Sequence, residues 1–138
     1  MSDGPAAAKT MSANEISHEV IKAALKVHSA LGPGLLESAY RGCLAYELRK
    51  AGFNVETEIL LPVVYDGIKL DFGYRIDMLV NDLVIVELKA VEKISPVHVA
   101  QTLCYMKLSK KQLGLIINFN VSHLKDGIKR LVEGSGWK

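Results

Sequence analysis

The sequence predicts an α/β domain of the α+β kind, in which helices pack on a mixed β-sheet. Apolar residues recur at helical spacing in two N-terminal segments, strand-like segments joined by tight turns follow, and a strand–helix–strand unit comes after them. The expected order of elements is ααβββαβα. Because 138 residues is close to the common size of one domain, we expect a disordered tail over residues 1–12 and a single domain over residues 13–138.

Two helices are expected at the start of the domain. The first begins near Asn14, a good N-cap residue, and ends at Gly32-Pro33-Gly34. The second covers residues 35–51, and Gly52 follows where a C-terminal cap belongs. The side chains of the second helix expected to face the core are Leu36, Tyr40, Cys43, Leu44 and Leu48.

Three strands are expected in the middle of the chain. Residues 55–65 are rich in Ile, Leu and Val, and Asp66-Gly67 is a strong hairpin signal before a second strand over residues 68–80. Asn81-Asp82 turns the chain again. The third strand, over residues 83–91, is almost continuously apolar, which predicts burial on both of its faces.

The last part of the chain predicts a helix, a strand and a helix. Ser95-Pro96 has the order of an N-cap and a first helical residue, so we expect a helix that runs to about Leu108. Residues 113–119 are typical of a buried strand. Residues 123–132 predict a last amphipathic helix.

Composition excludes several classes of protein. With 49% hydrophobic and 23% charged residues, the chain is of ordinary globular composition, and no apolar run is long enough to span a bilayer. Residues 1–10 lack the apolar core of a secretory signal. Cys43 and Cys104 lack the spacing of metal ligands, so we expect both to be small core residues. These features favour a cytoplasmic protein without a membrane partner.

The charge distribution is uneven along the chain. Residues 1–106 carry ten Lys and Arg against thirteen Asp and Glu, a net charge of −3, whereas residues 107–138 carry seven against two, a net of +5. The basic end is either a solvated face or a contact for a phosphate backbone. The cationic side chains that make this end basic are Lys107, Lys110, Lys111, Lys125, Lys129 and Arg130.

Three charged residues interrupt the apolar strands. Glu87 and Lys89 are two residues apart, so they share one face of the third strand, and the turn at Asn81-Asp82 brings Asp77 of the preceding strand beside them. Charges in such a strand cost several kcal/mol each, on the order of the usual burial penalty, unless they are compensated. A buried Glu87–Lys89 ion pair is one explanation, and pairing of Asp77 with Arg75 is another. A divalent cation is the explanation we favour, because Mg²⁺ prefers carboxylate oxygens.

The chain resembles a known nuclease superfamily in these residues and beyond them. Asp77 followed by Glu87-Leu88-Lys89 is similar to the D…(D/E)-x-K signature of the PD-(D/E)xK nucleases, although Ile76 replaces the proline before the aspartate. Gln101-Thr102-Leu103-Cys104-Tyr105 is similar to the Q-x-x-x-Y element of RecB-like and related branches. Gly34-Leu35-Leu36-Glu37-Ser38-Ala39-Tyr40 fits the G-x-x-E-x-x-Y pattern of the GxxExxY family within this superfamily. The resemblance spans about residues 14–133 and implies a restriction-endonuclease-like core.

The resemblance implies a role for each residue of the motifs. Asp77, Glu87 and the backbone carbonyl of Leu88 would bind Mg²⁺ or Mn²⁺, and Glu37 would complete the metal shell. Glu37 also fits an ordinary exposed carboxylate at a helix N-terminus. Lys89 would orient the attacking water or offset charge on the phosphoryl oxygens. Gln101 and Tyr105 would face the site, whereas His98 is expected to be a capping or surface histidine.

The sequence therefore predicts a Mg²⁺-dependent nuclease that hydrolyses phosphodiester bonds in DNA or RNA. The alternative is a catalytically silent domain of the same fold that binds nucleic acid or protein. A third possibility is a hydrolase of smaller phosphate esters. Because a small domain has little surface for sequence readout, we expect a homodimer or a partner protein to supply specificity.

Overall fold

Two helices begin the described part of the chain, which covers residues 10–133 in this computed structural model. Helix α2 spans Ala13–Leu31, and its N-cap is Ser12 rather than Asn14. The Ser12 hydroxyl accepts from the backbone N–H of Glu15 at 3.1 Å, and the Glu15 carboxylate accepts from the backbone N–H of Ser12 at 2.9 Å. This capping box satisfies two N–H groups at once, which explains why the helix begins before Asn14. The expected tail falls mainly on residues 1–9, which lie outside the described residues.

Helix α3 spans Glu37–Lys50, close to the predicted range. Gly52 follows its C-terminus with a φ of 97°, a conformation that glycine adopts readily, as expected for a helix-terminating residue. Tyr40, Leu44 and Leu48 face the core as predicted. Leu36 does not, since it is the N-cap residue and 77% exposed.

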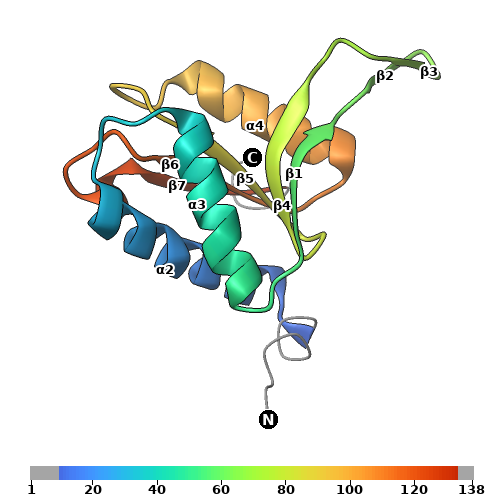
Figure 1. The fold of residues 1–138 in the computed structure, drawn as a ribbon. Coiled ribbons are helices and arrows are strands. Elements are labelled where there is room, and N and C mark those ends of the chain that lie inside the picture. The colour runs from blue at the N-terminus through green and yellow to red at the C-terminus, as the bar shows by residue number, and fades with distance from the viewer. Residues whose placement is uncertain (1–9, 134–138) are drawn as a thin grey trace.

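A five-stranded mixed sheet forms the centre of the molecule (Figure 1). Its order is β1-β4-β5-β6-β7, and the β5–β6 pair is parallel while the other three pairs are antiparallel. The prediction that the strands of Asp77 and Glu87 are adjacent and antiparallel is confirmed. The strands of the sheet are β1 (Val55–Leu60), β4 (Arg75–Val80), β5 (Val84–Lys89), β6 (Leu113–Asn118) and β7 (Ile128–Val132).

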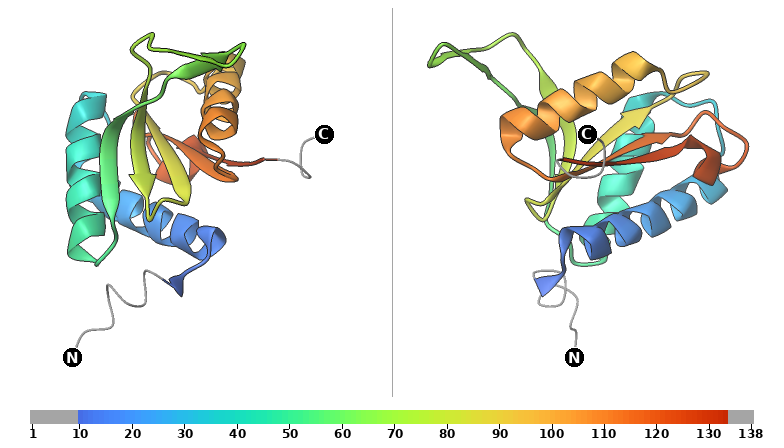
Figure 2. Two further views of the ribbon diagram at one scale, coloured as in Figure 1. Left: turned by 90° about the vertical axis from the view of Figure 1, so that its right-hand side faces the viewer. Right: turned by 180° about the vertical axis from the view of Figure 1, so that it is seen from behind.

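The two long strands predicted over residues 55–65 and 68–80 are each interrupted. Pro62 lies between β1 and β2 (Val63–Tyr65), and the extended ladder stops there because proline has no N–H to donate. Residues 71–74 separate β3 (Ile68–Leu70) from β4. Strands β2 and β3 pair only with each other, and their hairpin projects beyond the sheet (Figures 1 and 2).

Helices cover both faces of the sheet. Figure 2 shows α2 and α3 on one side and α4 (Pro96–Ser109) on the other. Val84, Val86 and Leu88 belong to the core beneath α2 and α3, whereas Ile85 packs with Met106 of α4. Helix α4 lies close against β6, because a Cβ atom on Gly114 would come within 2.8 Å of the Met106 sulfur.

The last helix predicted, over residues 123–132, is wrong. A short 3₁₀ turn (Leu124–Gly127) leads into β7, which pairs antiparallel with β6 from Ile117↔Ile128 to Leu113↔Val132. Strand β6 is buried along its whole length, so its outer backbone groups need a partner strand. Tertiary pairing therefore overrides the local helical pattern.

The prediction of two core cysteines is also wrong, because Cys43 and Cys104 are both exposed free thiols. Each lies on its helix beside the buried stripe and not within it: Leu44 follows Cys43, and Tyr105 follows Cys104. Within residues 10–133, no helix has both the length and the apolar character needed to cross a membrane.

Candidate active site

The ladder between β4 and β5 opens at the two acidic residues. Its last pair is Met78↔Val86, although β4 extends back to Arg75 and β5 extends forward to Lys89. The next positions in this register are Asp77 and Glu87. Figure 1 shows the two strands diverging beyond the turn that joins them, with β4 following β1 and β5 following β6. We call this opening the fork.

The side chains of Asp77 and Glu87 occupy the fork by bonding to each other's strands. The backbone N–H of Asp77 donates to Oε2 of Glu87 at 2.9 Å, and the backbone N–H of Leu88 donates to Oδ2 of Asp77 at 2.8 Å. Two backbone N–H groups at the end of the ladder thus bind carboxylates in place of carbonyl oxygens. The exchange also holds both carboxylates inside the fork.

The two carboxyl groups are costly to ionise together. Burial raises the pKa of Glu87 to about 8, and the nearby Asp77 carboxylate adds to that rise. Burial also raises the pKa of Asp77, while the Leu88 N–H and the Lys89 and Arg41 charges oppose the rise. Only 3% of Glu87 is exposed. Such a pair is stabilised in its ionised form by a cation between the carboxylates.

Leu88 and Lys89 contribute groups at the same end of β5. In an extended strand the N–H and C=O of one residue point to the same side, so the carbonyl of Leu88 faces the fork with its N–H. The carbonyl of Lys89 faces the other way and accepts from the N–H of Phe119 at 2.9 Å. The half-buried Lys89 side chain shares the face of Glu87, and its charge lowers the pKa of both acids.

Helix α3 brings its first turn to the end of β5. Oε2 of Glu37 accepts from the N–H of Ala90, the residue after β5, at 3.2 Å. The Glu37 charge raises the pKa of both Asp77 and Glu87, so this carboxylate lies near the fork. Arg41, one turn further along α3, lowers the pKa of Asp77 and pairs with Glu58 at 3.6 Å. The spacing of four residues between Glu37 and Arg41 was a signal in the sequence for a second charged group on this face.

Tyr40 fixes the loop that aims α3 at the fork. Its hydroxyl donates to the carbonyl of Gly32 at 2.6 Å and accepts from the N–H of Leu35 at 3.1 Å. Its ring stacks on Phe119, with centroids 4.4 Å apart and planes 11° apart. Gly34 has a φ of 108° in the same loop, a region that glycine tolerates without strain. The G-x-x-E-x-x-Y pattern thus positions Glu37.

Helix α4 supplies Tyr105 and Gln101 from the opposite face of the sheet. Tyr105 is 7% exposed, and burial followed by the Glu87 charge raises the pKa of its hydroxyl. Gln101 is half-buried one turn earlier on the same stripe of the helix. His98 caps α4 as expected, because its Nδ1 accepts from the N–H of Ser95 at 3.0 Å.

Asn118 is a buried polar residue with a structural role, and it belongs to Asn118-Phe119-Asn120, a phrase that is also similar to the GxxExxY family. It is 1% exposed at the end of β6, opposite Lys89. Its Oδ1 accepts from the N–H groups of Val91 (3.1 Å) and Asn120 (3.2 Å), and its Nδ2 donates to the carbonyl of Val91 at 2.8 Å. It therefore clamps the segment that follows β5. A polar residue after five apolar strand residues was the available signal.

Some of the predicted site residues lie closer together in the structure than others. Asp77, Glu87 and Lys89 converge with the backbone of Leu88, and Glu37 reaches the edge of the same site. Among residues 10–133, no three His, Cys, Asp or Glu side chains form a cluster that could hold a metal ion without further ligands. The available donor set is thus two carboxylates, a main-chain carbonyl and water, which is a set that Mg²⁺ accepts.

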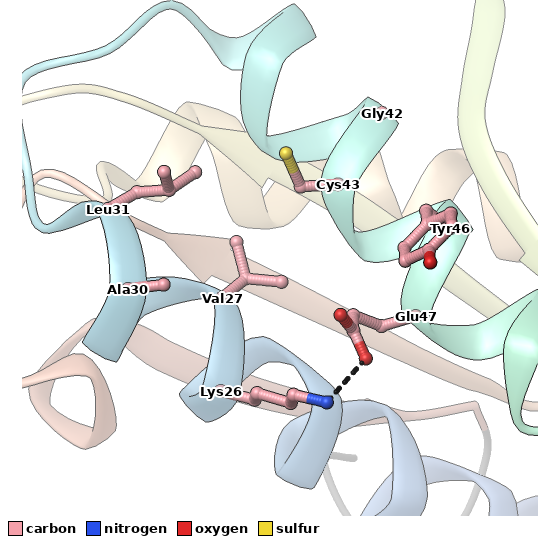
Figure 3. A pocket seen from close by; sticks show the side chains of 8 residues that line it. All are labelled: Lys26, Val27, Ala30, Leu31, Gly42, Cys43, Tyr46 and Glu47. Atoms are coloured by element: carbon pink, nitrogen blue, oxygen red, sulfur yellow. Dashed lines mark ion pairs between the residues drawn. The ribbon is translucent and has the colours of Figure 1, made fainter.

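An apolar groove elsewhere lacks this chemistry. It lies between α2 and α3 and is crossed by the Lys26–Glu47 ion pair at 3.0 Å (Figure 3). Val27 and Tyr46 are among its lining residues, and none of the predicted site residues lines it. The fork is therefore the candidate site.

A comparison with known families decides the assignment. The family model of the PD-(D/E)XK nuclease superfamily matches residues 14–131. The chain belongs to the PD-(D/E)XK nuclease superfamily. No curated protein and no solved structure matches the chain.

Membership in the PD-(D/E)XK superfamily agrees with the mixed sheet and its helices, which form a restriction-endonuclease-like fold. It also indicates hydrolase chemistry on nucleic acid, since this is a superfamily of nucleases that generally use divalent metals. The acids and the lysine at the fork are those whose spacing in the sequence is similar to the superfamily's signature.

Proposed function

We propose that this protein is a Mg²⁺- or Mn²⁺-dependent nuclease that hydrolyses phosphodiester bonds in DNA or RNA, and that it belongs to the GxxExxY branch of its superfamily. The observation that carries the proposal is the fork, where Asp77 and Glu87 lie together with Lys89 on the same face. Burial of two carboxylates beside each other is destabilising on its own, and it is relieved by a cation.

Asp77, Glu87 and the carbonyl of Leu88 would hold the metal ion. When bound, the ion polarises a phosphoryl oxygen and makes water a stronger nucleophile. Glu37, whose carboxylate accepts from the N–H of Ala90 at the edge of the fork, would complete the metal shell. The donor set leaves positions open for water and a phosphate oxygen, as Mg²⁺ sites in phosphoryl chemistry require.

Lys89 is proposed as the catalytic cation. Its ammonium lies on the Glu87 face at the end of β5 and is half-buried, so it can approach a phosphate while remaining close to the acids. It would orient the attacking water and offset the negative charge that develops on the phosphoryl oxygens. Gln101 and Tyr105 line the α4 side, where they would order Lys89 or the phosphate.

The substrate arrives as a polyanion, and basic side chains near the site would bind its backbone. Arg41 lies beside Asp77, and Arg75 is exposed in the same strand as Asp77. In the basic C-terminal quarter, Lys129 and Arg130 lie on β7, two strands from β5, and the Arg130 guanidinium donates to Asn14 at the start of α2. Lys129 is therefore the better candidate of the two for a backbone contact. We further propose a cytoplasmic protein that acts as a homodimer or with a partner protein.

The test is cleavage of labelled single- and double-stranded DNA and RNA. The parent protein should cleave at least one of these polymers with Mg²⁺ or Mn²⁺ and none with EDTA. Asp77→Asn and Glu87→Gln, purified in parallel, should be inactive, because each variant removes a carboxylate that the ion needs. Metal-independent binding without cleavage by the parent would instead indicate a catalytically silent binding domain, and cleavage of model diesters alone would indicate a small-ester hydrolase.

A further inference from the structure

The β2–β3 hairpin exposes apolar and aromatic side chains beside the candidate site. It continues from the ends of β1 and β4 and projects away from the sheet (Figures 1 and 2). Tyr65 is 73% exposed at its tip, and Phe72 is 62% exposed on the segment that returns to β4. An isolated two-stranded hairpin is only marginally stable in water. Exposed apolar side chains gathered on such a hairpin indicate a surface used for binding.

Three aromatic rings lead from this hairpin to the fork. Phe72 and Tyr74 have ring centroids 6.5 Å apart, and Tyr74 and Tyr105 have ring centroids 6.2 Å apart. Exposure falls along the series, from 62% at Phe72 to 44% at Tyr74 and 7% at Tyr105. Tyr105, the last ring of the series, lies near the fork, since the charges of Glu87 and Asp77 help to raise the pKa of its hydroxyl.

The net charge of the hairpin segment, residues 60–76, indicates which form of nucleic acid it binds. Between residues 60 and 76, Lys69 and Arg75 are balanced by Asp66 and Asp71, so the segment has no net charge. Duplex binding depends mainly on cationic contacts to phosphates. Single-strand binding adds stacking of unpaired bases on aromatic rings, which needs no net charge in the stacking surface itself.

We propose that Phe72 and Tyr74 form a stacking platform for the bases of single-stranded nucleic acid, and that this platform guides the strand into the fork. The inference rests on the proposed function for its direction toward Asp77 and Glu87. The stacking itself is independent of cleavage. Arg75 is exposed directly after Tyr74 and donates to the Tyr74 carbonyl at 3.3 Å, and we expect its remaining N–H donors to bind a phosphate of the strand.

Binding in EDTA tests the platform without cleavage. The full chain is titrated into labelled oligothymidine, oligouridine and a DNA duplex of the same length, and affinity is read by fluorescence anisotropy. Phe72→Ala and Tyr74→Ala should each weaken single-strand binding by about 5- to 150-fold, the range for one base stack. Duplex affinity should be unchanged. Tyr74→Phe should retain single-strand affinity, whereas Tyr74→Leu should lose it, because leucine preserves apolar area without a ring face.

Tyr46→Ala is the matched control, since Tyr46 is 61% exposed but lies on α3 at the groove away from the fork. It should leave both affinities unchanged. The platform proposal would be overturned if the Phe72→Ala and Tyr74→Ala variants lost affinity equally for single strands and duplex, or if neither variant lost single-strand affinity. Self-association of the parent that Phe72→Ala abolishes, with single-strand affinity intact, would show instead that the hairpin pairs two copies. Ring-dependent binding by a parent that cleaves nothing would support the platform and reject the nuclease.

Discussion

Asp77 and Glu87 lie opposite each other where their strands part, and the backbone N–H of Asp77 donates to the Glu87 carboxylate at 2.9 Å. Each acid binds a backbone N–H of the other's strand at this opening. The Leu88 carbonyl lies on the same side of β5 as the N–H that binds Asp77, so the proposed metal ligands lie together at this opening.

Metal affinity should depend on both acids. Asp77→Asn and Glu87→Gln each keep an oxygen that can accept the existing backbone hydrogen bond, so the fold should survive. Each should weaken Mg²⁺ or Mn²⁺ binding at least tenfold, about 1.4 kcal/mol, because a charged ligand is lost. Titration calorimetry measures the affinity. Glu56→Gln, an exposed acid on β1, is the control, and unchanged affinity in both fork variants would reject these ligands.

The stability of the metal-free protein should fall as pH rises. The folded chain raises the pKa of Glu87 from 4.5 to about 8, so between these values it holds a proton that the unfolded chain has released. The contribution of Glu87 to stability is therefore greatest below pH 4.5 and should decline by on the order of a few kcal/mol up to about pH 8. Urea denaturation in EDTA from pH 4 to 9 measures this decline.

Two controls identify the source of the pH dependence. Glu87→Gln cannot ionise at this position, so its stability should vary much less over the same range. Added Mg²⁺ should restore stability at high pH, since it binds the ionised carboxylates. A decline of the same size in the parent and in Glu87→Gln would assign the effect to other groups.

Asn118 should be a stability residue. Asn118→Ala removes three hydrogen bonds and leaves the N–H and carbonyl of Val91 without their partner, which should cost about 2–4 kcal/mol of unfolding free energy. Denaturant melts give the difference. Asn120→Ala, at an exposed position two residues later, should change stability by less than about 0.5 kcal/mol. Equal stability of the two variants would contradict the clamp.

Tyr40 should stabilise the loop before α3 through its hydroxyl. Tyr40→Phe keeps the stack on Phe119 but removes the hydrogen bonds to Gly32 and Leu35, for an expected loss of about 1–2 kcal/mol. Tyr46→Phe, at an exposed position of the same helix, is the control. Thermal unfolding followed by circular dichroism compares the two, and a neutral Tyr40→Phe would show that the ring alone holds the loop.

Much of the fold follows from local patterns in the sequence. The apolar spacing of α2 and α3, the turn between β4 and β5 and the Ser95-Pro96 start of α4 are all properties of neighbouring residues. The position of Glu87 and Lys89 on one strand face follows from the period of two. The convergence of Asp77 with this pair could be predicted because only a short turn, residues 81–83, separates their strands.

Other features depend on contacts that are distant in sequence. Residues 128–132 form β7 because β6 needs a partner, and nothing within the segment itself specifies this. Gly127 permits the turn before β7, since a Cβ atom there would lie 2.3 Å from the carbonyl oxygen of Asn118. The exposure of Cys43 likewise depends on how α3 is rotated against α2. Such features are decided by packing and not by local propensity.

The central claim is that the fork performs catalysis, and Lys89 tests it most directly. Lys89→Ala removes the charge that we propose acts on the scissile phosphate in the transition state, while the proposed metal ligands remain. Single-turnover cleavage of whichever polymer the parent cuts, with Mg²⁺ or Mn²⁺, should slow at least about 100-fold, roughly 2.7 kcal/mol, and affinity for that polymer should change much less. Lys93→Ala, at an exposed position four residues later, should cleave like the parent. Equal cleavage by Lys89→Ala and the parent, purified in parallel, would contradict the catalytic role of the fork.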